Sequence, residues 1–414
     1  MLSSSSGTHD AYAAWRLSAF RRYFAGNAIL FLGWQMQKVA VGWEIYERTG
    51  SALNLGYAGL AQFLPQVLWV LVAGHVTDTF NRKRVLMAAL TFNAIASVGL
   101  ALNSVRGGSV YLIYACLFAT GTARAFFMPA RAAFLPRIIP LPIFSNAVSW
   151  NSTGFELASM TGPAVGGLLI GFFRSATLVY VITALGAITF VIMLGNIPYK
   201  HASQERPPIT LHALSVGFRF IWKSKAVLAS MLLDMFGVLL GGATAMMPIY
   251  AKDILQVGPR GLGWLMAAPS IGACTMALLQ AHRGPLRRAG RTLLFAVAGF
   301  GTVTIVFGIS RTFWLSMAML CLLGSCDNIS VVVRSTLIQM LTPDDMRGRV
   351  SALNGLFIGT SNELGAFESG LVAGFLGPVF SVVSGGIGTL LVVAAIAWLF
   401  PQLRSYGRLD QPAH

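Results

Sequence analysis

Residues 151–169, NSTGFELASMTGPAVGGLL, and residues 354–372, NGLFIGTSNELGAFESGLV, carry one asparagine and two glycines at matching places, 203 positions apart. The same offset relates an arginine and a proline just before each stretch. The pairs are Arg131 and Arg334, Pro140 and Pro343, Asn151 and Asn354, Gly162 and Gly365, and Gly167 and Gly370. In a membrane protein, such a repeat indicates two related halves that enclose a binding site near the bilayer midplane.

The composition indicates that these halves lie in lipid. Hydrophobic residues make up 55% of the 414 and charged residues 11%, whereas about 25% of a soluble domain is charged. A helix needs roughly 20 apolar residues to cross a bilayer, and membrane strands would alternate apolar and polar positions instead. We therefore predict an all-α membrane protein with twelve transmembrane helices in two pseudosymmetric six-helix bundles. The predicted spans are 21–47, 52–76, 84–105, 110–136, 144–173, 176–196, 225–251, 259–281, 291–310, 313–341, 347–376 and 378–400.

The lysines and arginines of the connections are concentrated on one side of the predicted membrane. The opposite side holds only Arg48, Arg106, Arg174, Lys252, Arg260 and Arg311. The positive-inside rule then places both termini in the cytoplasm. Basic inner loops that face anionic lipid account for the net charge of +16 without a nucleic acid partner. The predicted organisation is a cytoplasmic segment 1–20, a six-helix bundle 21–196, a cytoplasmic linker 197–224 with an amphipathic helix, a second six-helix bundle 225–400 and a cytoplasmic tail 401–414.

The connection after the second span reads GHVTDTFNRKR. An acid at the end of a helix, followed by three cations, can bind a neighbouring helix terminus in one arrangement of the halves and release it in another. The loop resembles the GxxxD-(R/K)-x-G-(R/K)-(R/K) motif of the major facilitator superfamily, with Gly74, Asp78, Arg82 and Lys83 at matching positions. The resemblance implies the major facilitator fold and a loop that stabilises the outward-open state.

The fifth span carries small residues at every fourth position, among them Gly162, which precedes Pro163. Small residues let another helix pack closely, and proline bends the span. The segment resembles the antiporter motif of facilitator exporters, so we expect Gly162 and Pro163 to take part in conformational gating. Three longer strings resemble the bacterial exporters that include the enterobactin exporter and macrolide efflux proteins. They are FRRYFAGNAILFLGWQMQKVAVGWEIYERTGSALNLGYAGLAQFLP, GFRFIWKSKAVLASMLLD and LTPDDMRGRVSALNGLFIGTSNELG.

Ionisable residues in the middle of spans are costly and mark transport pathways by default. The predicted substrate and proton pathway comprises Lys38, Arg124, Arg131, Glu156, Asp234, Asp327, Arg334 and Glu363. Arg124 and Asp327 are 203 positions apart and are expected to face each other across the path. A cluster of Lys38, Arg124 and Glu156 is a working hypothesis. Asp327 is the first candidate for the proton switch, because a carboxylate whose cation partner comes and goes can bind and release a proton. A permanently neutralising ion pair is the alternative role for Asp327.

These features favour a secondary active exporter that moves a small amphipathic molecule of drug or siderophore type by alternating access. Exchange for protons is implied by the resemblance, so the energy source is the proton gradient, and no cofactor or metal is expected. The sequence contains no Gly-x-x-x-x-Gly-Lys loop and no His/Glu metal motif, and we do not expect an enzyme. The alternatives are a lipid or lysophospholipid translocator of the same fold and a non-transporting scaffold or sensor. We expect a monomer in the inner cell membrane.

Overall fold

The computed structural model describes residues 10–199, 211–282, 288–343, 346–405 and 407. This part of the chain is almost entirely helical and contains no strand. The predicted linker and both terminal segments lie partly outside the described residues. The elements are η1 Ala13–Arg16, α1 Ser18–Thr49, α2 Ala52–Thr79, α3 Arg82–Val105, α4 Val110–Ile138, α5 Leu141–Phe173, α6 Thr177–Gly195, α7 Leu211–Lys223, α8 Lys225–Leu240, η2 Ala243–Met246, α9 Met247–Ile249, η3 Tyr250–Ile254, α10 Gly258–Ala281, α11 Ala289–Ile309, α12 Phe313–Leu341, α13 Arg347–Leu376, α14 Pro378–Leu399 and α15 Pro401–Ser405.

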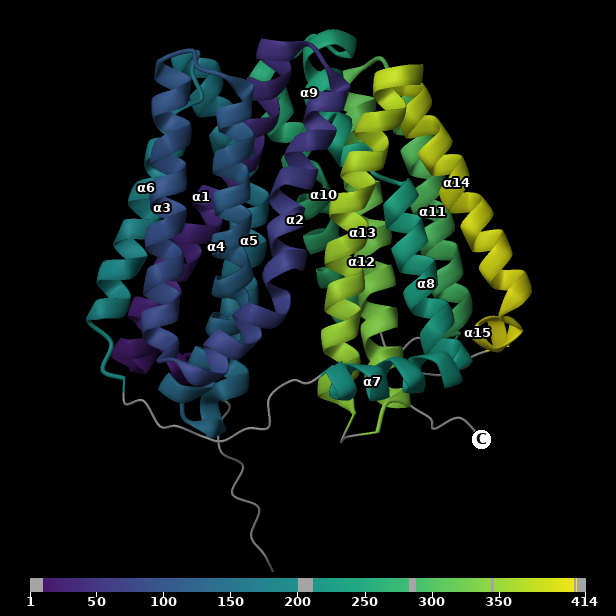
Figure 1. The fold of residues 1–414 in the computed structure, drawn as a ribbon. Coiled ribbons are helices and arrows are strands. Elements are labelled where there is room, and N and C mark those ends of the chain that lie inside the picture. Colours follow the sequence, from purple (N-terminus) through teal and green to yellow (C-terminus); the bar gives the residue numbers. More distant parts are fainter. Residues whose placement is uncertain (1–9, 200–210, 283–287, 344–345, 406, 408–414) are drawn as a thin grey trace, which may run out of the picture.

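Twelve segments cross the molecule from one end to the other (Figure 1). Ten of them are long and apolar enough to span a membrane. The other two, α1 and α13, have 32 and 30 residues and carry several charged and amide side chains. Because the number of crossings is even, η1 and α15 lie at the same end, at the bottom of Figure 1. We call this end the terminal face and the opposite end the far face. The predicted all-α fold with twelve membrane helices is confirmed.

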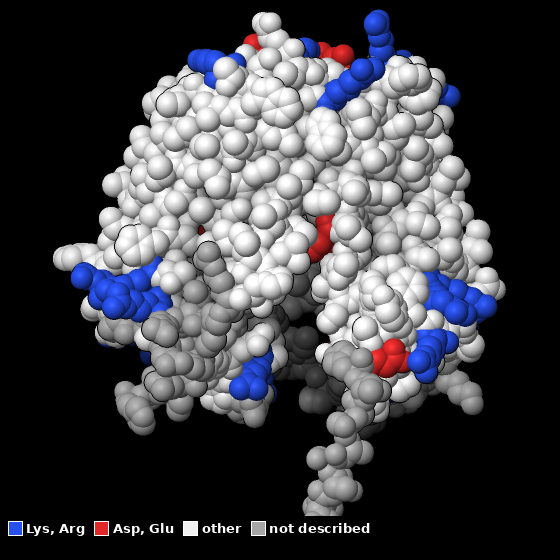
Figure 2. All heavy atoms as spheres, turned by 180° about the vertical axis from the view of Figure 1, so that it is seen from behind, with Lys and Arg blue, Asp and Glu red and all other residues white. Residues whose placement is uncertain are grey.

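The helices group into two halves. Helices α1 to α6 pack with one another, and so do α8 to α14. The halves meet mainly where α5 packs on α10 and where α2 packs on α13. Helix α7 lies along the terminal face against α13 (Figure 1), and it exposes the large apolar side chains Phe218 and Trp222. In Figure 2 a broad, mostly uncharged band separates the charged ends of the molecule, as expected for a surface that faces lipid, and an acidic group is visible between the halves near its centre.

Glycine pairs let the helix backbones touch at both joints between the halves. A Cβ built on Gly167 of α5 would lie 2.7 Å from the Cα of Gly263 on α10. In the second joint, a Cβ on Gly370 of α13 would lie 2.6 Å from the Cα of Gly56 on α2. Gly370 follows Gly167 by 203 positions, and Gly263 follows Gly56 by 207. The joints are therefore related by the repeat. Both are near the far face, where α5 and α13 end and α2 and α10 begin.

The sequence predicts one continuous span over 225–251 for the seventh crossing. In the structure this crossing is broken into several short helical pieces. Helix α8 ends at Leu240, and the 3-10 helix η2, the short α9 and the π-helix η3 complete the crossing. Gly241 and Gly242 lie at the break, where a Cβ on Gly242 would meet the Gly365 carbonyl of α13 at 2.7 Å. Pro248 follows and has no N–H for a helical hydrogen bond. The close approach of α13 and these residues explain the break.

Candidate functional site

The two halves are joined on the far face and separated on the terminal face. Figure 2 shows a hollow between them that opens at the bottom, while side chains close the top. On the far face, Tyr46 of α1 donates a hydrogen bond to Asp253 of η3, and the ammonium of Lys252 lies 5.5 Å from the Tyr46 ring centre. Arg260 of α10 reaches the carbonyl of Gly171 on α5 at 3.5 Å. All these contacts must break before the far face can open.

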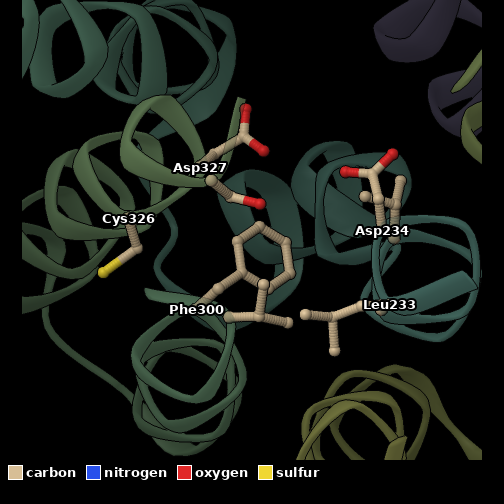
Figure 3. Close-up of a pocket in the computed structure, with 9 residues that line it drawn as sticks. Leu233, Asp234, Phe300, Cys326 and Asp327 are labelled. Atoms are coloured by element: carbon tan, nitrogen blue, oxygen red, sulfur yellow. The ribbon is translucent and has the colours of Figure 1, made fainter. Parts of the chain in front are cut away.

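Arg334 of α12 and Asp234 of α8 form a buried ion pair. The exposed fraction is 2% for Arg334 and 7% for Asp234. Figure 3 shows Asp234 and Asp327 with their carboxyl groups on the same side of the Phe300 ring. The cavity that these residues line measures about 10 Å³, roughly the space of a single water. Asp327 forms no ion pair with any residue that the structure describes.

Arg131 of α4 occupies the corresponding place in the N-terminal half. Its Nε donates to Oδ1 of Asn27 on α1 at 3.1 Å, and its guanidinium lies 4.9 Å from the ring centre of Phe31. Asn27 and Asp234 are 207 positions apart, the same offset that relates the joint glycines of α2 and α10. A neutral amide therefore stands where the second half has a carboxylate. Arg131 and Glu156 line a cavity of about 510 Å³ between α1, α4 and α5.

A third group of charges links the halves. Lys38 of α1 and Arg124 of α4 lie close enough to Glu363 of α13 for its charge to attract both. The guanidinium of Arg124 is 5.0 Å from the Trp34 ring centre. Oε2 of Glu363 would lie 3.9 Å from a Cβ on Gly59, so the carboxylate reaches α2. One anion of the second half thus lies within electrostatic reach of two cations of the first. We call Lys38, Arg124 and Glu363 the inter-half charge cluster.

The hypothesis that groups Glu156 with Lys38 and Arg124 does not match this arrangement. Glu156 is exposed and lines the Arg131 cavity instead. The small-residue stripe of α5 packs on α1 within the same half, where a Cβ on Gly162 would lie 2.6 Å from Cβ of Gln35. Because Glu156 lies off this stripe, it points to the cavity beside α1 and α4.

The loop between α2 and α3 is bound to its own half. The ammonium of Lys83 donates to the carbonyls of Gly195 and Ile197 at the end of α6, both at 2.9 Å. Arg82 is buried, whereas Asp78 is exposed and has no ion pair within the described ranges. The described part of the loop therefore makes no charge latch to the other half in this arrangement, in which the halves stand apart on the terminal face.

The remaining predicted gating residues have different surroundings. The carbonyl of Pro163 would lie 2.6 Å from a Cβ on Gly263, so it contributes to the joint with α10. Gly74 has no neighbour within 4 Å of a built Cβ. Sequence reasoning missed Asn27, Tyr46 and Asp253. The first two spans precede their counterparts in the second half by 207 positions, and this offset could have identified Asn27 as the equivalent of Asp234. Nothing in the sequence pattern marks the Tyr46–Asp253 contact.

The chain is similar to known proteins over almost its whole length. The family model of transmembrane secretion effectors matches residues 9–413. The enterobactin exporter EntS of Shigella dysenteriae serotype 1 (strain Sd197) is 26% identical over 391 residues, which cover 94% of this chain and 93% of that protein. The enterobactin exporter EntS of Escherichia coli O1:K1 / APEC has the same identity and coverage.

Solved structures share the fold. A bacterial homologue of the human lysosomal transporter Spinster, in an inward-facing and unoccupied conformation, has a TM-score of 0.75 and 14% identity, covering 98% of this chain and 100% of that one. The POT family transporter PepTSo has a TM-score of 0.72 and 11% identity, covering 93% of this chain and 98% of that one. The family match and the shared fold lead to one assignment. The chain belongs to the transmembrane secretion effector family of the major facilitator superfamily.

Proposed function

We propose that this transporter is a secondary active exporter that works by alternating access and moves a small amphipathic organic molecule. The observation that carries the proposal is the one-sided closure of the two halves. Glycine joints and the Tyr46–Asp253 hydrogen bond hold the far face shut, while a hollow opens at the terminal face. A carrier has to close one face before it opens the other, and rocking of two repeats about a central site achieves this.

The orientation of the molecule follows from its charge. Lysines and arginines are concentrated in the connections at the terminal face, which supports a cytoplasmic location for this face and for both termini. In this orientation the hollow opens to the cytoplasm, so cargo enters from inside the cell. The names of the enterobactin exporters among the relatives support outward transport and a siderophore-like or drug-like cargo across the inner membrane.

We propose protons as the coupling ion and Glu363 as the carboxylate that exchanges them. Its cations, Lys38 and Arg124, belong to the other half, so rocking of the halves changes their distance from Glu363. A charged Glu363 attracts the other half, and a protonated one does not. This dependence of a cation partner on conformation is what a proton switch requires.

The other carboxylates of the predicted pathway are less suited to this role. The charge of Asp234 is compensated by Arg334 of the same half, so rocking of the halves leaves this pair intact. Asp327, the first candidate from the sequence, becomes the second, because it lies beside Asp234 and has no ion pair in the described chain. Glu156 is exposed in the Arg131 cavity and is the third.

The test is cargo-dependent proton movement in proteoliposomes, with a panel of siderophores, macrolides, dyes and lysolipids. Wild type is compared with Glu363→Gln and Asp327→Asn. Glu47→Gln is the matched control, since Glu47 is an exposed carboxylate of α1 near the far face. We expect protons to move opposite to the cargo in wild type and control, and we expect Glu363→Gln to abolish this proton movement.

Three outcomes would contradict parts of the proposal. Cargo movement by wild type that is indifferent to the pH gradient would exclude proton antiport. Movement of lysolipids alone would favour the lipid translocator, and movement of no member of the panel would favour a scaffold or sensor. Normal proton movement in Glu363→Gln together with its loss in Asp327→Asn would transfer the coupling role to Asp327.

A further inference from the structure

We propose that Arg131 is the anion-binding residue of the cavity between α1, α4 and α5, that this cavity receives the cargo, and that the cargo combines an apolar body with one anionic group. This proposal rests on the proposed function and names its substrate class. The evidence is an asymmetry between two arginines that the repeat relates, Arg131 and Arg334.

Arg334 is not available to a ligand. Asp234 neutralises it, only 2% of its surface is exposed, and the cavity beside it measures about 10 Å³. Arg131 differs in each respect. Its polar neighbours are neutral groups, the amide of Asn27 and the hydroxyl of Tyr23; it forms no ion pair with any described residue, and it lines a cavity of about 510 Å³. The first half thus holds a half-buried cation that lacks a permanent counter-ion.

Asn27 is itself held in place. Its Nδ2 donates to Oδ1 of Asn151 on α5 at 3.4 Å, and Nδ2 of Asn151 donates to the carbonyl of Ala147 at 3.0 Å. This chain of amides orients Oδ1 of Asn27 toward Nε of Arg131. One edge of the guanidinium is therefore fixed by the protein, which pre-organises the group for a ligand.

The other walls of the cavity suit an apolar body. Its volume is within the range of about 300–1,000 Å³ that is usual for small-molecule sites. Arg131 lies over the Phe31 ring, so an aromatic surface adjoins the charge. The large apolar side chains of the lining are Phe31, Met128, Leu135, Phe144 and Phe155, and the aromatic ring of Tyr23 adjoins them.

Glu156 adds a second polar contact. It is the carboxylate among the described lining residues, and it is exposed, so solvent screens its charge. A carboxylate accepts hydrogen bonds and does not donate them. The preferred ligand therefore carries a hydrogen-bond donor, such as an amine or hydroxyl, in addition to its anionic group. The anion is carried either by a soluble organic acid or by the headgroup of a lipid, because both offer the same chemistry to Arg131.

The test is a fluorescence titration of the purified full-length chain in an uncharged detergent. The probes are anilinonaphthalene sulfonate, which is anionic, and phenylnaphthylamine, which has a similar ring system and no charge. Arg131→Gln removes the cation. Asn27→Asp introduces the carboxylate that the second half has, and it should neutralise Arg131. Glu47→Gln, an exposed carboxylate of α1 near the far face and outside this cavity, is the control. Equal detergent concentrations make the micelle signal common to all samples.

We expect Arg131→Gln and Asn27→Asp to weaken binding of the anionic probe about tenfold or more, because a hydrogen bond to a charged group is lost. The neutral probe should bind wild type, Arg131→Gln and Asn27→Asp alike, and Glu47→Gln should not weaken binding of either probe. Unchanged affinity for the anionic probe in both variants would overturn the proposal. An equal loss for both probes would also overturn it, since this would indicate a damaged cavity.

Competition in the wild type distinguishes the two sources of the anion. Displacement of the bound probe by lysophosphatidylglycerol, and not by naphthalene sulfonate, would assign the site to a lipid headgroup. The reverse result would assign it to a soluble acid. Displacement by neither compound would contradict an anion site. The fluorescence titration needs neither a membrane nor an ion gradient. A negative result would therefore exclude the anion site without bearing on proton-coupled transport, which the proteoliposome assay tests separately.

Discussion

Arg334 and Asp234 form the most deeply buried ion pair in the described part of the molecule. Asp234→Asn would leave the Arg334 charge without a counter-ion between α8 and α12. Breaking a buried pair by removal of one partner costs about 3–5 kcal/mol. We expect a loss of this size in the free energy of unfolding, measured by denaturation of the purified protein in detergent.

Two further variants test this explanation. The double variant Asp234→Asn/Arg334→Gln removes both charges and should recover most of the lost stability. Asn27→Ala is the matched control in the first half, where the hydrogen bonds to Arg131 and Asn151 are lost but no counter-ion is removed, and about 1–3 kcal/mol is expected. A double variant as unstable as Asp234→Asn would show that the charge balance is not the cause.

The mid-span charges themselves could be predicted from the sequence, because each one is costly in lipid. Their partners could not. One offset of 203 relates the later spans, but 207 relates the first two spans to their counterparts, so Asn27 was not recognised as the equivalent of Asp234. Helix periodicity shows which residues share a face and not which helix lies opposite. For this reason Glu156 was grouped with cations that Glu363 attracts in the structure.

At the scale of the helix, the joint between α2 and α13 depends on two glycines. Gly370→Leu would place a side chain where the Gly56 backbone lies, and it should force the far face apart. We expect faster labelling of Ala366→Cys by a membrane-impermeant maleimide, in a background without the four native cysteines. Ala366 is a suitable reporter because its Cβ would lie 3.3 Å from a Cβ on Gly59, within the joint.

Gly355→Leu is the control on the same helix. Nothing lies within 4 Å of a Cβ built at Gly355, so the substitution should leave the labelling rate at Ala366→Cys unchanged. Equal rates in the Gly370 and Gly355 variants would mean that the joint is not what closes the far face.

Most helices could be predicted because a bilayer imposes their length. The sixth span was predicted at 176–196 and is α6, Thr177–Gly195, and the fifth was predicted at 144–173 and is α5, Leu141–Phe173. The break in the seventh crossing could not be predicted from hydropathy. It depends on the approach of α13 to Gly242, which is a contact between distant parts of the chain.

At the scale of the whole molecule, every contact between the halves described above belongs to one arrangement of two rigid bundles. The glycine joints and the Tyr46–Asp253 hydrogen bond hold the far face closed, and the inter-half charge cluster adds an attraction that Glu363→Gln would remove. This substitution should therefore favour opening of the far face and closure of the terminal face.

The most direct test of alternating access is a pair of spin-label distances, recorded in lipid with Glu363 present and with Glu363→Gln. Phe80→Cys with His282→Cys reports on the terminal face, and Tyr111→Cys with Trp314→Cys reports on the far face; all four residues are exposed, and each pair joins the two halves. We predict that Glu363→Gln shortens the terminal-face distance and lengthens the far-face distance. Two distances that change in the same direction, or that are the same with and without the Glu363 charge, would contradict the account.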